Sequence, residues 1–284
     1  MALCSVCGKR QAVYHHTYSG KNLCIKCLSN MIERSVKRGI NKTKALKYDS
    51  RIIIPIVHFS PSSSIVLANM VSRIERKFNT TILVLIPEVY NYNDIYQKLE
   101  RSNIESIARV KVNASIKGSL SLEECIRLER AWILKIADEL GYDVIMLPIT
   151  RTDISLMLLD LLLNGKKEYL SEVLDIDYIK GIKVLYPFSS IEGEALASYE
   201  AISGSYVEPF CNVKMKTKKI FYSVAGFRPE LDFGSARIIP SIPNLEFGRC
   251  EICGGFSEKK TCELCEKLDL KNMQISIYGD KGPS

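Results

Sequence analysis

The sequence is poor in the side chains that enzymes most often use for acid–base chemistry, and it lacks long hydrophobic runs. Its 284 residues include only three histidines, His15, His16 and His58, so the commonest general base is scarce. No secretory signal opens the chain, and its most apolar helical stretch, 153–164, is short and carries two aspartates. We therefore expect a core helix there, no membrane span and a cytoplasmic protein.

Glycine is missing from a place where an α/β protein often needs it. Residues 57–68, "VHFSPSSSIVLA", lie between an apolar run and a helical pattern, as phosphate-binding loops do. Pro61 removes one backbone N–H from this turn, serine tolerates positive φ less well than glycine, and no lysine follows. The loop is therefore a poor phosphate cradle, although hydroxyls at a helix N-terminus can still hold an anion weakly.

Strand-like and helix-like segments alternate from residue 49 to about 235. This alternation predicts a mostly parallel sheet flanked by helices, with its ligand crevice at the carboxyl ends of the strands. The expected strands are 51–58, 81–87, 106–113, 143–148 and 183–187, and the expected helices are 64–78, 92–102, 121–140, 153–164 and 190–202. The last residues, "YGDKGPS", are expected to form a flexible tail.

Eight of the ten cysteines form four Cys-x-x-Cys pairs, two near each end of the chain. Each end supplies four thiolates, enough to close one tetrahedral zinc site, so we expect two structural zinc modules. Free or redox thiols are a weaker interpretation, and replacement of one ligand by His15 or His16 stays open. The expected ligands are Cys4, Cys7, Cys24 and Cys27, and Cys250, Cys253, Cys262 and Cys265.

Two cysteines lie outside the pairs, and two stretches are rich in lysine and arginine. Cys125 fits an amphipathic helix as a small core residue, whereas Cys211 precedes a basic run. Such a run is usually a solvated face, and a net charge of +7 permits a polyanionic partner without requiring one. The position of these stretches beside a cysteine module and in a cysteine-bearing loop favours contact with a phosphate backbone. The candidate RNA-binding residues are Arg34, Lys37, Arg38, Lys42, Lys44, Lys47, Lys214, Lys216, Lys218 and Lys219.

A cysteine module, a basic helix, an α/β domain and a second cysteine module together resemble the tRNA 2-thiolation family. Its enzymes adenylate a uridine with ATP on a PP-loop, Ser-Gly-Gly-x-Asp-Ser, before sulfur is inserted. The "PSSS" core here is similar to the second, non-thiolating subunit of the eukaryotic cytoplasmic wobble-uridine thiolase, and the shorter chain resembles an archaeal-type relative. The loop aligns with Phe59 at the first serine, Ser60 and Pro61 at the two glycines, Ser62 at the variable position, Ser63 at the aspartate and Ser64 at the last serine.

The resemblance implies further losses. Where active enzymes have Gly-His-Asn-Leu-Asp-Asp, this chain has "PITRTD" and retains only Asp153 of the acids. Active members hold an iron–sulfur cluster or a catalytic cysteine pair with a Cys-x-x-Cys plus a distant cysteine. Leu122 stands at the first of these three positions, Cys125 at the second and Cys211 at the third. Both cysteines are therefore expected to be remnants. We expect zinc at both ends of the chain, and we expect neither ATP nor an iron–sulfur cluster to bind.

The resemblance implies a degenerate PP-loop (adenine nucleotide alpha hydrolase-like) fold with terminal zinc modules. The expected function is that of a non-catalytic subunit that pairs with an active thiolase paralogue and helps to bind tRNA. A ubiquitin-like sulfur-carrier pathway is expected as a further partner. Two alternatives stay open, namely an active ATP-dependent thiolase with a serine-based loop and a zinc-stabilised scaffold with another RNA or protein partner. The expected divisions are 1–30 (zinc module), 31–48 (basic helix or linker), 49–235 (α/β domain) and 236–284 (zinc module and tail).

Overall fold

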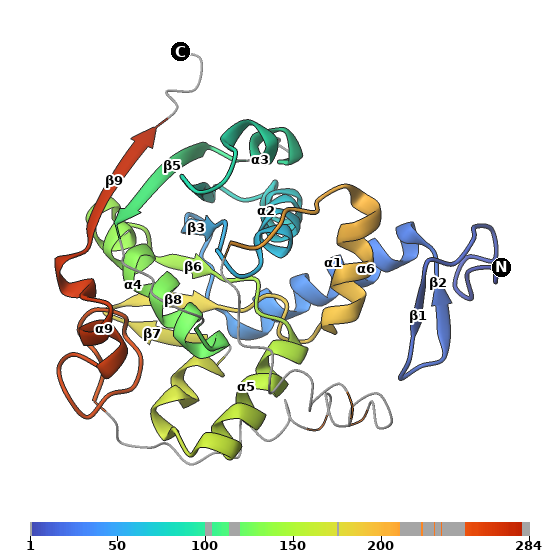
Figure 1. The fold of residues 1–284 in the computed structure, drawn as a ribbon. Helices are drawn as coiled ribbons and strands as arrows, with labels where there is room; N and C mark the ends of the chain where they lie inside the picture. The colour runs from blue at the N-terminus through green and yellow to red at the C-terminus, as the bar shows by residue number, and fades with distance from the viewer. Residues whose placement is uncertain are drawn as a thin grey trace.

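A seven-stranded sheet forms the centre of this computed structural model, which describes residues 2–99, 104–113, 120–174, 176–210, 223, 230, 234 and 248–279. The strand order is β7-β8-β6-β3-β4-β5-β9 (Figure 1). The five inner strands are parallel, and the two edge strands are antiparallel to their neighbours. Their bounds are β3 (Arg51–Pro55), β4 (Thr81–Pro87), β5 (Ser106–Asn113), β6 (Val144–Met146), β7 (Ile176–Ile179), β8 (Ile182–Leu185) and β9 (Gln274–Gly279).

Successive side chains of the central strand point to opposite faces, and each face is covered by helices. In β3, Ile53 belongs to one core cluster, whereas Ile52 and Ile54 belong to the other. The first cluster includes residues of α4 (Leu122–Leu140), α5 (Arg151–Asn164) and α9 (Glu263–Lys267). The second includes residues of α1 (Ile25–Thr43), α2 (Pro61–Glu75), α3 (Tyr92–Lys98) and α6 (Gly193–Ser203).

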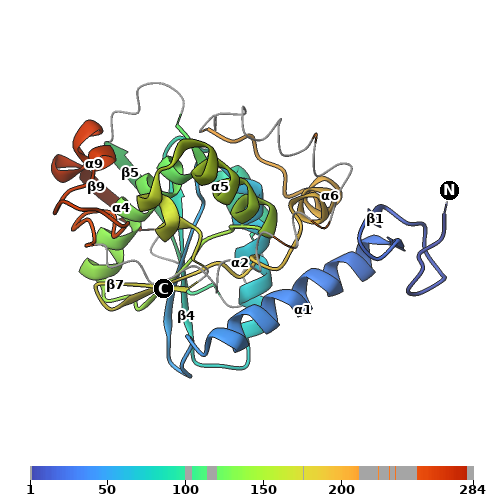
Figure 2. The ribbon, with the colours of Figure 1, turned by 90° about the horizontal axis from the view of Figure 1, so that it is seen from below.

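The N-terminal segment is a small hairpin joined to a long amphipathic helix. β1 (Tyr14–His16) pairs with β2 (Lys21–Leu23), and α1 follows directly. Leu28, Ile32, Val36 and Ile40 recur every four residues of α1 and are buried, so one stripe of the helix packs on the core. Figure 2 shows α1 running from the hairpin to the sheet, which places the hairpin at the side of the molecule.

The mostly parallel sheet flanked by helices confirms the fold predicted from the sequence. All five predicted strands and all five predicted helices are present, with shifts of a few residues at their ends. The sequence missed the two edge strands. β9 pairs with β5 from Ala108↔Gly279 to Asn113↔Gln274, so Tyr278 and Gly279 belong to the sheet and not to a tail. Within the described part of the chain, no helix has both the length and the apolar character needed to cross a bilayer.

Candidate functional site: a serine loop and two four-cysteine groups

The loops after β3 and β6 meet at the switch point of the sheet. These strands are neighbours, but the chain continues from β3 toward β4 on one side and from β6 toward β8 on the other. Ligands of open α/β sheets bind at this point, outside the carboxyl ends of the strands. The structure therefore brings the predicted loop, Ser60–Ser64, and the predicted acid, Asp153, to the same edge of the sheet.

The hydroxyls of the serine loop are all engaged by the protein itself. Ser60 Oγ donates to Ser63 Oγ at 2.8 Å, and Ser64 Oγ donates to the Ser60 carbonyl at 3.2 Å. Ser62 Oγ accepts from the Val207 N–H at 2.9 Å and also donates to the Val207 carbonyl at 3.1 Å. Pro61 is the first residue of α2 and has no N–H to offer. The loop is thus closed by internal hydrogen bonds.

A carboxylate from α6 reaches into this loop. Ser63 Oγ donates to Glu200 Oε1 at 2.6 Å. Burial raises the pKa of the Glu200 carboxyl to about 7, with a smaller contribution from Asp153, and the Ser63 hydrogen bond opposes this shift. The sequence carried no signal for Glu200, because it lies 137 residues from Ser63 and in no recognisable motif.

Replacing Glu200 by glutamine is expected to flatten the pH dependence of stability. The carboxyl titrates near 4.5 in the unfolded chain and near 7 in the folded one. The folded state therefore binds more protons between these values, and the free energy of unfolding falls as the pH rises through this window. The loss is on the order of 2 kcal/mol for wild type. Urea unfolding at pH 5 and pH 8 measures it.

Glu194→Gln is the matched control for Glu200→Gln, since Glu194 is exposed on the same helix. It should keep the wild-type loss of stability between the two pH values. Equal pH dependence in wild type and Glu200→Gln would contradict the shifted carboxyl.

The retained acid, Asp153, caps a helix. Its carboxylate accepts from the Thr150 N–H at 2.9 Å, and its own N–H donates to Thr150 Oγ1 at 3.2 Å, which forms a capping box at the start of α5. Arg151, the residue after Thr150, donates to Glu192 Oε1 at 2.8 Å. Glu192 also accepts from the Tyr14 hydroxyl at 2.6 Å. These contacts connect the N-terminal hairpin to the edge of the crevice.

His58 is paired with a buried glutamate beneath the loop. Its Nδ1 and its backbone N–H both lie 2.7 Å from Glu129 Oε1, and Trp132 Nε1 donates to the other oxygen of Glu129 at 2.8 Å. Sequence reasoning passed over Glu129, which lies on α4 far from the loop in the chain. The pair fixes the strand end that leads into the serine loop.

The eight paired cysteines form two groups, as the spacing predicted. The Sγ atoms of Cys4, Cys7, Cys24 and Cys27 lie within 4.8 Å of one another, and so do those of Cys250, Cys253, Cys262 and Cys265. None of the eight is in a disulfide. In the N-terminal group two cysteines are buried and two are half-buried, whereas all four of the C-terminal group are buried. Four converging thiols at this spacing fit a metal centre.

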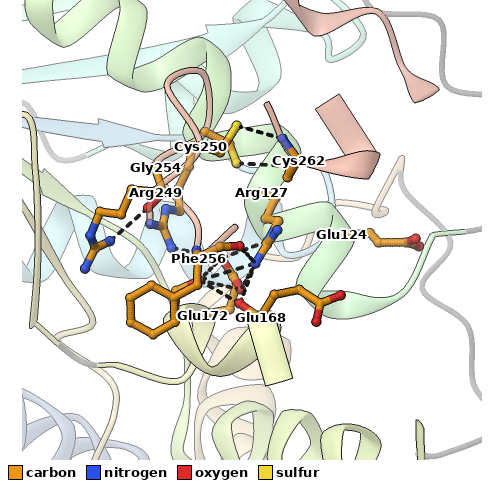
Figure 3. A network of polar contacts seen from close by, with 12 residues as sticks. Glu124, Arg127, Glu168, Glu172, Arg249, Cys250, Gly254, Phe256 and Cys262 are labelled. Atoms are coloured by element: carbon orange, nitrogen blue, oxygen red, sulfur yellow. Dashed lines mark hydrogen bonds and ion pairs between the residues drawn. The ribbon is translucent and has the colours of Figure 1, made fainter. Parts of the chain in front are cut away.

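The C-terminal group is built into the core and not appended to it. Its four cysteines belong to the same core cluster as α4 and α5, and Cys262 N–H donates to Cys250 Sγ at 3.4 Å (Figure 3). N–H donation of this kind stabilises a thiolate. The chain then continues through α9 and η4 (Leu270–Asn272) into β9, so this group sits directly before an edge strand of the sheet.

The other candidate residues separate into three cases. Cys125 is 2% exposed in the core face of α4 and belongs to neither four-cysteine group. Helix α1 carries Arg34, Lys37, Arg38 and Lys42, and Lys44 and Lys47 follow its end; all six are exposed. Cys211, Lys214, Lys216, Lys218 and Lys219 lie outside the described residues.

Comparison with known proteins gives a structural match. No family model and no curated protein matches the chain. A solved structure does: the U34-tRNA thiolase NcsA from Methanococcus maripaludis with its [4Fe-4S] cluster has a TM-score of 0.74 and 17% identity, over 94% of this chain and 95% of that one. The chain has the fold of a tRNA thiolase. At this identity the likeness concerns the fold alone, and it agrees with the mostly parallel α/β sheet flanked by helices that the sequence predicted.

The same comparison corrects the cofactor expectation. We expected zinc in both groups and no iron–sulfur cluster, but the structural neighbour carries a [4Fe-4S] cluster. Four cysteine thiolates are the usual ligands of such clusters as well as of structural zinc. Both groups here therefore fit either a zinc ion or an iron–sulfur cluster, and the exclusion of a cluster was wrong. The spacing of Cys-x-x-Cys pairs fixes the ligand type but not the metal.

Proposed function

We propose that this protein is a non-catalytic subunit of a tRNA wobble-uridine 2-thiolation complex that pairs with an active thiolase paralogue and helps to bind tRNA. The fold shared with a U34-tRNA thiolase supports the reaction class. The Glu200 carboxylate against Ser63 carries the non-catalytic part of the proposal. Above pH 7, where most of the Glu200 carboxyl is ionised, its charge repels the phosphates of a nucleotide, and its burial strengthens that repulsion.

A degenerate PP-loop accounts for the hydrogen bonds of the serine turn. A phosphate-binding loop offers N–H and hydroxyl donors to its ligand. Here Ser60, Ser62, Ser63 and Ser64 donate to protein acceptors instead, and Pro61 removes a backbone donor. A nucleotide would have to break these bonds and displace Glu200 to enter the loop.

In this proposal each part of the chain has its own role. Residues 1–30 and 236–284 hold the metal centres, 31–48 contact tRNA, and 49–235 form the degenerate domain that pairs with the paralogue. The exposed cations of α1 support the tRNA contact, because positive charge on one helix face attracts a phosphate backbone. Sulfur reaches the active partner through a ubiquitin-like carrier pathway, and the complex works in the cytoplasm.

The test is to assay this chain, the paralogue from the same genome, and their complex. We expect co-purification of the two chains, 2-thiouridine formation by the complex, and none by this chain alone. Titration of the lone chain with ATP and Mg²⁺ should show no saturation below about 1 mM. Micromolar ATP binding together with thiolated tRNA would replace this proposal by the active-enzyme alternative. Failure to bind either the paralogue or tRNA would favour the scaffold alternative.

Glu200→Gln tests the role of the carboxylate within the same titration. Glutamine keeps a hydrogen-bond acceptor for Ser63 but removes the negative charge. Above pH 7, where most of the wild-type carboxyl is ionised, Glu200→Gln is expected to bind ATP more tightly than wild type does. The Glu194→Gln control should bind ATP no better than wild type does.

A further inference from the structure

A buried arginine lies between the C-terminal four-cysteine group and the α/β core. Arg127 is on α4 and 1% exposed. Its Nη2 donates to Glu172 Oε2 at 3.2 Å, to the Glu168 carbonyl at 2.5 Å and to the Phe256 carbonyl at 3.1 Å (Figure 3). Phe256 lies on the loop that connects Cys253 with Cys262. One guanidinium therefore joins α4 and the 3₁₀ helix η2 (Lys167–Glu172) to that loop.

The carboxylate that Arg127 contacts is shared with a second arginine. Glu172 Oε1 lies 3.2 Å from Arg127 Nε and 3.2 Å from Arg130 Nη1, and all three side chains are at most 1% exposed. Among the described residues, no other carboxylate contacts Arg127. A buried cation requires a compensating negative charge, and the single Glu172 carboxylate is shared between two guanidinium groups.

The loop that Arg127 contacts carries a cysteine at each end. Gly255, whose Cβ position lies 2.8 Å from Arg127 Cζ, and Phe256, whose carbonyl accepts from Arg127, both lie between Cys253 and Cys262. Four thiolates that hold a divalent ion, or an oxidised [4Fe-4S] core, keep a net negative charge in either case. The need for a nearby cation is therefore the same for both kinds of centre.

Two glycines let the cysteine loop close onto the guanidinium. A Cβ at Gly255 would lie 2.8 Å from Arg127 Cζ and 3.0 Å from Glu172 Oε1. Gly254 has a φ of 70°, and a Cβ there would lie 2.2 Å from Ile179 Cγ2. Any side chain at Gly255 would push the loop and the arginine apart, so the contact depends on this glycine.

We propose that Arg127 is a positioning residue of the C-terminal metal centre. Its charge compensates the thiolates when they hold an ion or a cluster, and its hydrogen bond to the Phe256 carbonyl fixes the loop between the two cysteine pairs. The inference concerns metal retention and is independent of the proposed role in tRNA thiolation.

The test compares metal release from Arg127→Met, Arg127→Lys and Arg130→Met in the full chain. Arg130→Met is the matched control, because it removes the second arginine that contacts the same Glu172 carboxylate. Metal content after purification and the rate of transfer to a chelator are measured where all variants are folded by circular dichroism. We expect release from Arg127→Met to be at least about tenfold faster than from wild type. Arg127→Lys and Arg130→Met should stay within about threefold.

Equal release rates for Arg127→Met and Arg130→Met would overturn the proposal, since both would then act through the fold alone. Gly255→Ala provides a second route if Arg127→Met does not fold. It leaves Arg127 in the sequence but displaces it from the loop, so faster metal release is expected. Release unchanged from wild type in folded Gly255→Ala would also overturn the proposal.

Discussion

Replacing Cys253 by serine is expected to cost more than about 4 kcal/mol of folding free energy and to free β9 from β5. Cys253 is 0% exposed within the core cluster that contains α4 and α5. Loss of one ligand removes the metal, and metal binding supplies folding energy to such a site. Without the metal, nothing holds the three remaining buried thiols, the new serine hydroxyl and the surrounding backbone in place.

The measurements for Cys253→Ser are metal per chain, the free energy of unfolding in urea, and hydrogen exchange of β5 and β9. Exchange should rise in both strands, because β9 reaches the sheet only through the C-terminal group and pairs with β5 along six residues. Cys125→Ala is the control, since Cys125 is buried in the same cluster but binds no metal in this assignment. It should cost about 1 kcal/mol and keep full metal content. Full metal content in Cys253→Ser would refute the ligand assignment.

Replacing a cysteine of the N-terminal four-cysteine group by serine should have a more local effect than Cys253→Ser. Cys7 and Cys27 are half-buried, and the N-terminal hairpin reaches the core through α1 and through the contact between Tyr14 and Glu192. The stripe of α1 that packs on the core begins at Leu28, after the last cysteine of the N-terminal group. Loss of the N-terminal centre is therefore expected to disorder the hairpin and leave the sheet intact, which distinguishes the two groups physically.

The parts of the fold that the sequence predicted are those with strong local signals. Runs such as "RIIIP" and "TILVLIP" are buried on both faces, and the helices between them have apolar spacing and caps such as Ser121 with Glu124. β9 escaped prediction because "QISIYG" is an edge strand with no buried residue, whose conformation comes from pairing with β5. Cysteine spacing predicted both four-thiol groups, since metal ligands must recur in pairs to surround one centre.

The parts of the site that the sequence did not predict are long-range contacts between single charged residues. Glu200 meets Ser63, Glu129 meets His58, and Glu172 meets Arg127, each across more than 40 residues of chain. Each glutamate lies in a helix where it is indistinguishable from a solvated residue in the sequence. Their roles follow from burial and from the partner, which only the folded chain determines.

Neutralising the exposed cations of α1 is expected to weaken tRNA binding by about 10²–10³-fold at low salt. Arg34, Lys37, Arg38 and Lys42 are exposed on one helix, and α1 presents no acid in its first turn. Lys37 pairs with Glu33 at 2.7 Å, but an exposed pair of this kind holds its charge only weakly. Replacing all four by glutamine should lower the slope of log Kd against log salt by about 3, since each lost phosphate contact removes about one released counterion.

A second variant with the same net charge separates a specific contact from a general effect. Lys259, Lys260, Lys267 and Lys271 are exposed around the C-terminal four-cysteine group, at the opposite end of the molecule from the N-terminal hairpin (Figure 1). Replacing these four by glutamine changes the net charge equally, and the affinity should fall by less than about tenfold. Binding is measured by titration of a U34-containing tRNA at several salt concentrations. Equal losses of tRNA affinity in the two variants would mean that binding depends on net charge alone and that α1 makes no specific contact with tRNA.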